Sequence, residues 1–230
     1  MVQFNVAARE INIKLVYYGP ALSGKTTNLQ MIHKLMNPDT RGRLMSLDTK
    51  DDRTLFFDLL PVQFKTKGGY SLKLKLFTVP GQVIHNSTRR VVLQASDGVA
   101  FIADSQNDQA KNNAESFRNL EENLSQNGID PADFPVVVQY NKRDLPKAQI
   151  KTPEEIKASW GGSGTPIYLA SAMTGDGVVE TFVRLVEQAF QHLNRKQKLE
   201  EKFGLDTKEF LASLLATFGR EGNAVPPGLC

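Results

Sequence analysis

Cysteine is nearly absent from this sequence, which has Cys230 as its single example in 230 residues. One cysteine excludes a disulfide within the chain, and no cluster of cysteine and histidine has the spacing of a zinc site. Prenylation at a C-a-a-X motif needs three residues after the cysteine, and none follows Cys230. We therefore interpret Cys230 as a free thiol in the tail.

Long apolar runs are also missing. None approaches the roughly 18 residues of a membrane span, so we expect no transmembrane segment. The first ten residues, MVQFNVAARE, lack the basic stretch and apolar run of a secretory signal. The net charge of +3 is too small to indicate nucleic acid as the main partner. We therefore expect a globular protein that stays in the cytoplasm.

Short apolar runs rich in β-branched residues alternate with longer segments of helical period. The runs predict strands at 11–18, 55–64, 70–79, 98–103, 134–140 and 166–169, with a hairpin turn at 67–69, and helices at 28–35, 107–127, 153–160 and 178–193. Strand and helix in repetition are typical of a mostly parallel sheet with helices on both faces. We expect an α/β fold of three layers with six strands, of which the second is antiparallel.

The chain divides into two predicted units, a sheet domain at residues 1–196 and a C-terminal extension at 197–230. In the extension, Asp206 and Glu209 have the spacing of a capping box, and apolar residues follow at helical spacing until Gly219. This pattern predicts a short amphipathic helix followed by a disordered end. The helix packs on the sheet domain, docks on a partner or lies on a membrane; Lys208 alone within it disfavours the membrane.

Residues 19–26, GPALSGKT, match the phosphate-binding pattern G-x-x-x-x-G-K-[ST] and lie between a predicted strand and a predicted helix. Glycines let backbone N–H groups point at phosphates, and a helix N-terminus adds partial positive charge. Lys25 is predicted to contact the β- and γ-phosphates, and Thr26 to bind Mg²⁺. A glycine turn that merely contains Lys-Thr is the alternative. The predicted contacts of this loop are Gly19, Leu22, Ser23, Gly24, Lys25, Thr26 and Thr27.

A second motif, Asn-Lys-Arg-Asp at 141–144, follows a predicted strand at the sheet edge where α/β proteins bind ligands. The Asp144 carboxylate accepts from two guanine N–H groups, whereas adenine has no such pair of donors. Asn141 is predicted to contact the purine and to join neighbouring loops, and the Lys142 stem to cover the base. Ser171 and Ala172 follow a later strand and are predicted to offer a backbone N–H to guanine O6. An ATP-driven enzyme is the alternative that these residues disfavour.

Together these motifs, with Ser-Ala-Met at 171–173, resemble the Ras-like small GTPases. More narrowly, AAREINIKLVYYGPALSGKTTNLQ, DDRTLFFDLLP at 51–61 and FTVPGQVIHNSTRR at 77–90 are similar to the bacterial MglA family, over roughly residues 4–195. The resemblance implies a P-loop NTPase G domain, GTP or GDP with Mg²⁺ as ligands, and slow hydrolysis of GTP. It also implies control of cell polarity or gliding motility through effectors, with recruitment to a cell pole.

The second switch departs from the common Ras-like pattern, although the MglA family shares the departure. Where those GTPases have Asp-x-x-Gly, this chain has Thr78-Val-Pro-Gly81. A neutral hydroxyl lacks the anionic acceptor for a Mg²⁺-bound water, which predicts weak Mg²⁺ binding and slow unaided hydrolysis. The resemblance makes Gln82 the residue that orients water and brings the Gly81 N–H to the γ-phosphate.

In the first switch, the resemblance makes Thr54 a ligand of Mg²⁺ and γ-phosphate and Arg53 an arginine finger supplied in cis. From the residues alone, Arg53 is a solvated loop arginine. The resemblance further implies activation by a roadblock-fold partner, an MglB-like homodimer that settles Arg53 and Gln82 into place. A pseudo-GTPase scaffold with negligible turnover is the alternative function.

Overall fold

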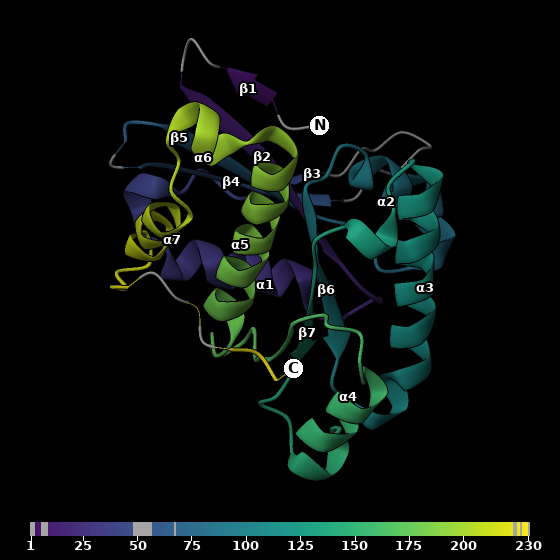
Figure 1. Ribbon diagram of the computed structural model, residues 1–230. Helices are drawn as coiled ribbons and strands as arrows, with labels where there is room; N and C mark the ends of the chain where they lie inside the picture. The colour runs from purple at the N-terminus through teal and green to yellow at the C-terminus, as the bar shows by residue number, and fades with distance from the viewer. Residues whose placement is uncertain are drawn as a thin grey trace.

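The computed structural model describes residues 3–5, 9–47, 57–66, 68–222, 225 and 227–229. These form a twisted sheet between two layers of helices (Figure 1). The strands are β1 Gln3–Asn5, β2 Glu10–Tyr18, β3 Met45–Leu47, β4 Phe57–Lys65, β5 Ser71–Thr78, β6 Gly98–Asp104, β7 Val136–Asn141 and β8 Ile167–Leu169. Their order is β3-β4-β5-β2-β6-β7-β8, with β1 paired to the start of β2.

The helices are α1 Lys25–Leu35, α2 Asn86–Leu93, α3 Ala110–Gln126, α4 Pro153–Ser159, α5 Val178–Gln197, α6 Leu199–Phe203 and α7 Thr207–Ala216. Short 3₁₀ turns occupy Pro38–Thr40, Val83–His85, Asn107–Gln109, Pro131–Asp133 and Lys147–Gln149. In Figure 1, α1, α5 and α7 lie on one face of the sheet, and α2 and α3 lie on the other. The expected three-layer α/β fold is therefore confirmed.

Five strands, β5, β2, β6, β7 and β8, run parallel to their neighbours in this set, whereas β4 is antiparallel to β5. These are the six predicted strands, and the antiparallel one is the second, as expected. The structure adds two three-residue strands, β1 and β3, each antiparallel to its partner. It also adds α2 and α6, which the sequence pattern did not reveal. Lys67 of the predicted hairpin turn lies outside the described residues.

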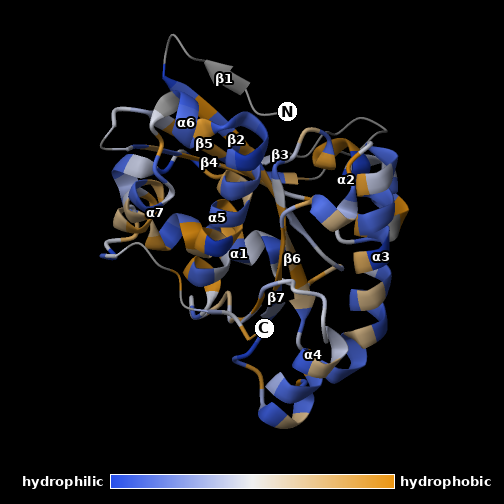
Figure 2. Ribbon diagram, in the orientation of Figure 1, coloured by the Kyte–Doolittle hydropathy of each residue, from blue (hydrophilic) through white to orange (hydrophobic). Residues whose placement is uncertain are grey.

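Apolar side chains fill both faces of the sheet. Figure 2 shows the strands as the most hydrophobic part of the fold and the outward faces of the helices as mainly hydrophilic. All seven residues of β6 are buried, as expected for a central strand covered on both faces. The two resulting cores hold the carboxyl ends of β2, β6 and β7 in register, and the loops that follow these strands build the site.

The C-terminal extension packs on the face of α1 and α5. Phe210 of α7 is fully buried, and its ring stacks on that of Phe190 with centroids 4.2 Å apart. Asp206 caps α7 by accepting from two backbone N–H groups. Glu209 does not complete a capping box, because its Oε1 accepts from the Gly68 N–H in the β4–β5 hairpin at 2.8 Å. Of the three alternatives for this helix, packing is the one that the structure describes.

Part of the predicted disordered end lies against the sheet. The Leu229 N–H donates to the carbonyl of Ile167 in the edge strand β8 at 2.6 Å. Arg220, the residue just before this end, pairs with Glu180 of α5 at 2.6 Å. The division at residue 196 stays a prediction. Across the described residues, no helix combines the length and apolar character needed to cross a bilayer.

Candidate nucleotide site

The phosphate loop connects β2 to α1 and needs glycine where the backbone is most crowded. Gly24 has φ +96°, and a Cβ on it would lie 2.1 Å from the Asn141 amide nitrogen. Lys25 is buried and donates to the carbonyls of Gly19 and Pro20 at 3.1 and 2.6 Å. Burial lowers the pKa of Lys25 to about 7, with a smaller lowering by Arg89 and an opposing effect of Asp58. The loop thus has the shape and the cation of a phosphate cradle.

The other predicted loop contacts differ in exposure. Leu22 has φ +60° and is 89% exposed, so its backbone rather than its side chain belongs to the cradle. Ser23 is buried, Thr26 is exposed and Thr27 is half-buried at the start of α1. A cavity of about 590 Å³ in front of this loop is lined by residues 24–27, Ser46, Asp58 and residues 78–81.

A buried carboxylate, Asp58 of β4, stands next to Thr78 and Thr26. Its Oδ2 accepts from the hydroxyls of Thr26 at 2.6 Å and Thr78 at 2.9 Å, and its Oδ1 from that of Ser46 at 2.7 Å. The Thr78 hydroxyl in turn accepts from the Asp58 N–H at 2.8 Å. From the sequence we expected only a neutral hydroxyl at this position. The structure shows that the Thr78 hydroxyl lies beside a carboxylate. The neighbouring antiparallel strand supplies the carboxylate that Thr78 lacks.

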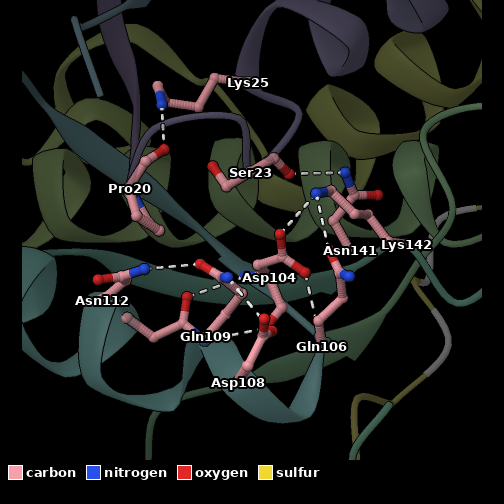
Figure 3. Close-up of polar contacts among 11 residues, drawn as sticks. Pro20, Ser23, Lys25, Asp104, Gln106, Asp108, Gln109, Asn112, Asn141 and Lys142 are labelled. Atoms are coloured by element: carbon pink, nitrogen blue, oxygen red, sulfur yellow. Dashed lines mark hydrogen bonds and ion pairs between the residues drawn. The ribbon is translucent and has the colours of Figure 1, made fainter. Parts of the chain in front are cut away.

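Asn141, at the end of β7, joins three loops. Its amide nitrogen donates to the Ser23 carbonyl at 2.8 Å, and its Oδ1 accepts from the Ala172 N–H at 2.8 Å. Figure 3 shows Asn141 reaching the phosphate loop at Ser23, on the same side as Lys142. The N–H of Ala172 is engaged within the protein. The motifs at 19–26, 141–144 and 171–172 thus converge at one end of the sheet.

The two charged residues of the base loop are each positioned by a partner. Lys142 has φ +71° and pairs with buried Asp104 at 2.6 Å (Figure 3). Asp144 is exposed, and its Oδ1 accepts from the Ser171 hydroxyl at 2.6 Å. The Asp144 carboxylate is therefore oriented by the loop after β8. Asp104 and Asp58 were not predicted, because their positions opposite Lys142 and Thr78 depend on pairing between strands.

The second switch lies against the phosphate loop. Gly81 sits so close that a Cβ on it would lie 2.3 Å from the Cα of Ala21. Gln82 follows with an exposed side chain. In α2, the fully buried Arg89 stacks over the Tyr18 ring at 4.2 Å and donates to the Ser116 hydroxyl at 2.8 Å. The predicted residues Arg53 and Thr54 lie outside the described residues.

A phosphate loop at the start of α1, an Asn-Lys-x-Asp loop after β7 and a switch glycine against the phosphate loop define a small GTPase. No family model matches the chain. The mutual gliding-motility protein MglA of Myxococcus xanthus is 45% identical over 191 residues, which cover 83% of this chain and 97% of that protein. The chain belongs to the MglA family.

More distant relatives show how far this domain extends. ADP-ribosylation factor-like protein 6 of Caenorhabditis briggsae is 28% identical over 200 residues, or 84% of this chain and 94% of that protein. Elongation factor 4 of Aster yellows witches'-broom phytoplasma is 31% identical over 147 residues, but these make up only 23% of that protein. Arf-like proteins therefore match over nearly their whole length, and the elongation factor over one part.

Proposed function

We propose that this chain is a switch that binds guanine nucleotide, hydrolyses GTP and controls cell polarity or motility. The observation that carries the proposal is Asn141, which joins the phosphate loop at Ser23 to the base-side loop at Ala172. One ligand with a phosphate at one end and a purine at the other fits between these loops. Membership of the MglA family gives no support to the pseudo-GTPase alternative.

Guanine recognition falls to Asp144. Its carboxylate accepts from the guanine N1–H and the exocyclic N–H₂, and the Ser171 hydroxyl holds it in orientation. Lys142, fixed by Asp104, places its apolar stem over the base. Adenine lacks an adjacent ring N–H and exocyclic N–H₂ pair that could donate to one carboxylate, so the site selects against ATP.

The oxygen atoms of the Thr26 hydroxyl and the Asp58 carboxylate are of the kind that binds a magnesium ion. Thr26 would hold the ion through its hydroxyl, as in other P-loop proteins, and the Asp58 carboxylate, which accepts from that hydroxyl at 2.6 Å, would supply negative charge beside the ion. Bound Mg²⁺ neutralises charge on the phosphates. Thr78 then serves to orient Asp58 rather than to replace it. Thr54 is proposed as the second ligand, from the first switch.

Hydrolysis is proposed to depend on both switches and on a partner. Gln82 orients the attacking water. The Gly81 N–H contacts the γ-phosphate, and this contact is lost when GTP is hydrolysed. Arg53 supplies a guanidinium to the transition state once a roadblock-fold homodimer has settled it. Full partner-stimulated turnover in a purified Arg53→Ala variant would contradict this role of Arg53. Motility effectors then read the GTP state, and recruitment to a cell pole is part of the same proposal.

Changing one residue tests the base assignment. Asn in place of Asp144 turns one acceptor oxygen into a donor amide, which repels the guanine N–H groups but matches the C2 carbonyl of xanthine. We expect Asp144→Asn to weaken GDP binding by about a hundredfold or more. We also expect this variant to bind xanthosine diphosphate (XDP) more tightly than GDP. Competition of GDP, XDP and ADP against a fluorescent nucleotide measures this, with Asp176→Asn as control. Unchanged GDP affinity in Asp144→Asn would overturn the assignment.

A further inference from the structure

A groove between α3 and α4, away from the nucleotide cavity, is floored by aromatic rings. It has a volume of about 380 Å³ and is open to solvent along one side. The rings of Phe101 and Phe117 meet edge to face with centroids 5.0 Å apart, and those of Phe117 and Trp160 do so at 4.9 Å. The nucleotide mechanism uses none of these three residues. Phe101 is fully buried, so the half-buried rings of Phe117 and Trp160 offer the apolar surface, in a groove of a size at which ligand pockets occur.

The groove exists because α3 carries small side chains where it faces α4. Ala110 and Ala114 are both exposed, lie one helical turn apart and line the groove with Phe117. On the opposite wall stand Ser159 and half-buried Trp160. Larger residues at the alanine positions would fill the space. An engineered apolar cavity of about 150 Å³ holds benzene, so this groove has room for a fused pair of rings.

The polar groups of the floor are already engaged within the protein. The Trp160 indole N–H donates to the Tyr140 hydroxyl at 3.1 Å. The Ser159 hydroxyl donates to the Ile156 carbonyl at 2.7 Å. Both ends of the Asn113 amide bond the backbone of Asp104 at 2.9 Å. The floor therefore matches an apolar body, which needs no hydrogen bond of its own.

The charges that line the groove are of one sign. Arg118 and Lys151 line it, and no carboxylate of the described part of the chain does. Neither residue belongs to an ion pair among the described residues. Arg118 is exposed and Lys151 is half-buried, so both remain hydrated until an anion arrives. A carboxylate or sulfonate on the ligand would complete the charge pairing.

We propose that the groove between α3 and α4 is a binding site for a small organic anion with a flat apolar body, such as an aryl carboxylate or sulfonate. The half-buried rings of Phe117 and Trp160 receive the body of the ligand, and the fully buried Phe101 supports Phe117 from within the core. Arg118 and Lys151 pair with its charged group. The ligand enters from solvent between the helices and does not compete with nucleotide.

The site provides its own reporter, since Trp160 is the only tryptophan of the chain. The probe is 8-anilinonaphthalene-1-sulfonate, added to the full-length protein loaded with GDP and Mg²⁺. Excitation of Trp160 is expected to give energy transfer to one bound probe per chain. Ala114→Phe and Ser159→Phe, which fill the groove from opposite walls, are expected to weaken this binding about tenfold or more. Ala216→Phe, an exposed alanine on α7, is the matched control.

Charge is tested without altering the floor. The neutral analogue N-phenyl-1-naphthylamine is compared with the sulfonate probe on wild type and on Arg118→Gln/Lys151→Gln. These rim residues are exposed or half-buried, so the double variant is expected to fold. We expect it to weaken the sulfonate several-fold and to leave the neutral probe unchanged. Equal binding of the sulfonate to wild type and to both groove-filling variants, or equal loss of both probes in the double variant, would overturn the proposal.

A ligand bound in the groove is expected to affect the base loop and thereby the release of nucleotide. This inference rests on the proposed function. Asn113 holds Asp104 by two hydrogen bonds, and Asp104 pairs with Lys142. A ligand against Asn113 favours this arrangement, so we expect saturating sulfonate probe to slow release of tritiated GDP at least about twofold. Unchanged release with the probe bound, as shown by Trp160 energy transfer, would refute the coupling. Absence of GDP binding would instead count against the proposed function.

Discussion

At the scale of residues, we propose that Asp58 takes the role that the second-switch aspartate has in other Ras-like GTPases. Its carboxylate accepts from the hydroxyls of Thr26, Thr78 and Ser46, and it comes from β4 rather than from the strand that carries Thr78. A negative charge thus lies beside Thr26, but it comes from a different position in the sequence than the Asp of the Ras-like Asp-x-x-Gly pattern. A hydroxyl at position 78 also avoids placing two carboxylates side by side.

Moving the carboxylate between the two strands tests this account. Asp58→Asn removes the charge, and we expect GDP affinity in the presence of Mg²⁺ to fall about 10- to 100-fold. Asp58→Asn/Thr78→Asp returns a carboxylate to the neighbouring position and is expected to recover part of that loss. Competition of GDP against a fluorescent nucleotide over a series of Mg²⁺ concentrations measures this affinity, with the exposed Asp39→Asn as control. Wild-type magnesium dependence in Asp58→Asn would rule out the role of Asp58.

At the scale of elements, the extension is part of the molecule's packing. Phe210 of α7 lies against Phe190 of α5 and Phe64 of β4, at 4.2 and 6.0 Å between ring centroids. Glu209 adds a hydrogen bond to the β4–β5 hairpin. The extension thereby braces β4, the strand that carries Asp58.

Removing the Phe210 ring measures how much the packing of α7 contributes to the free energy of unfolding. Phe210→Ala is expected to lower the free energy of unfolding by about 3–5 kcal/mol, because it removes a fully buried aromatic side chain. Lys208→Ala, exposed on the same helix, is expected to change it by less than about 0.5 kcal/mol. Urea unfolding followed by circular dichroism gives both values. A loss below about 1 kcal/mol for Phe210→Ala would show that α7 contributes little to the core.

The elements also show what the sequence could and could not reveal. β6 and α5 were predictable because a continuous apolar run and a sustained helical period are local signals. α2 was not predicted because two of its buried positions, Thr88 and Arg89, are polar. These residues interrupt the apolar pattern by which a helix is recognised in a sequence. In the site, the phosphate loop is a contiguous motif, whereas Asp58 meets Thr78 only through the antiparallel pairing of β4 with β5. Such a contact leaves no trace in either segment alone.

At the scale of the whole molecule, one buried carboxylate makes stability depend on pH. Asp97 accepts from the Lys14 N–H at 2.8 Å, and burial raises its pKa to about 6 from 3.8. The folded state therefore binds more protons than the unfolded chain between these values, so stability falls as pH rises through this range. The cost of ionising Asp97 is complete above about pH 6 and reaches up to about 3 kcal/mol.

Asp97→Asn keeps an acceptor for Lys14 and removes the ionisation. We expect its free energy of unfolding, relative to wild type, to rise between pH 4 and pH 7 by up to about 3 kcal/mol. Urea unfolding at both pH values measures the difference, and Asp108→Asn, at an exposed aspartate, serves as control. A difference that is constant or shrinks as pH rises would contradict the raised pKa of Asp97.

We propose that the molecule as a whole is a switch driven by GTP hydrolysis, with a base site that excludes adenine. Phosphate release by the purified full-length protein, supplied in parallel with Mg²⁺GTP and Mg²⁺ATP, tests it most directly. We expect slow release of phosphate from GTP, faster release when the roadblock-fold partner is added, and no release from ATP above the protein-free rate. Release from ATP at a rate equal to that from GTP, or no release from GTP even with the partner, would contradict it.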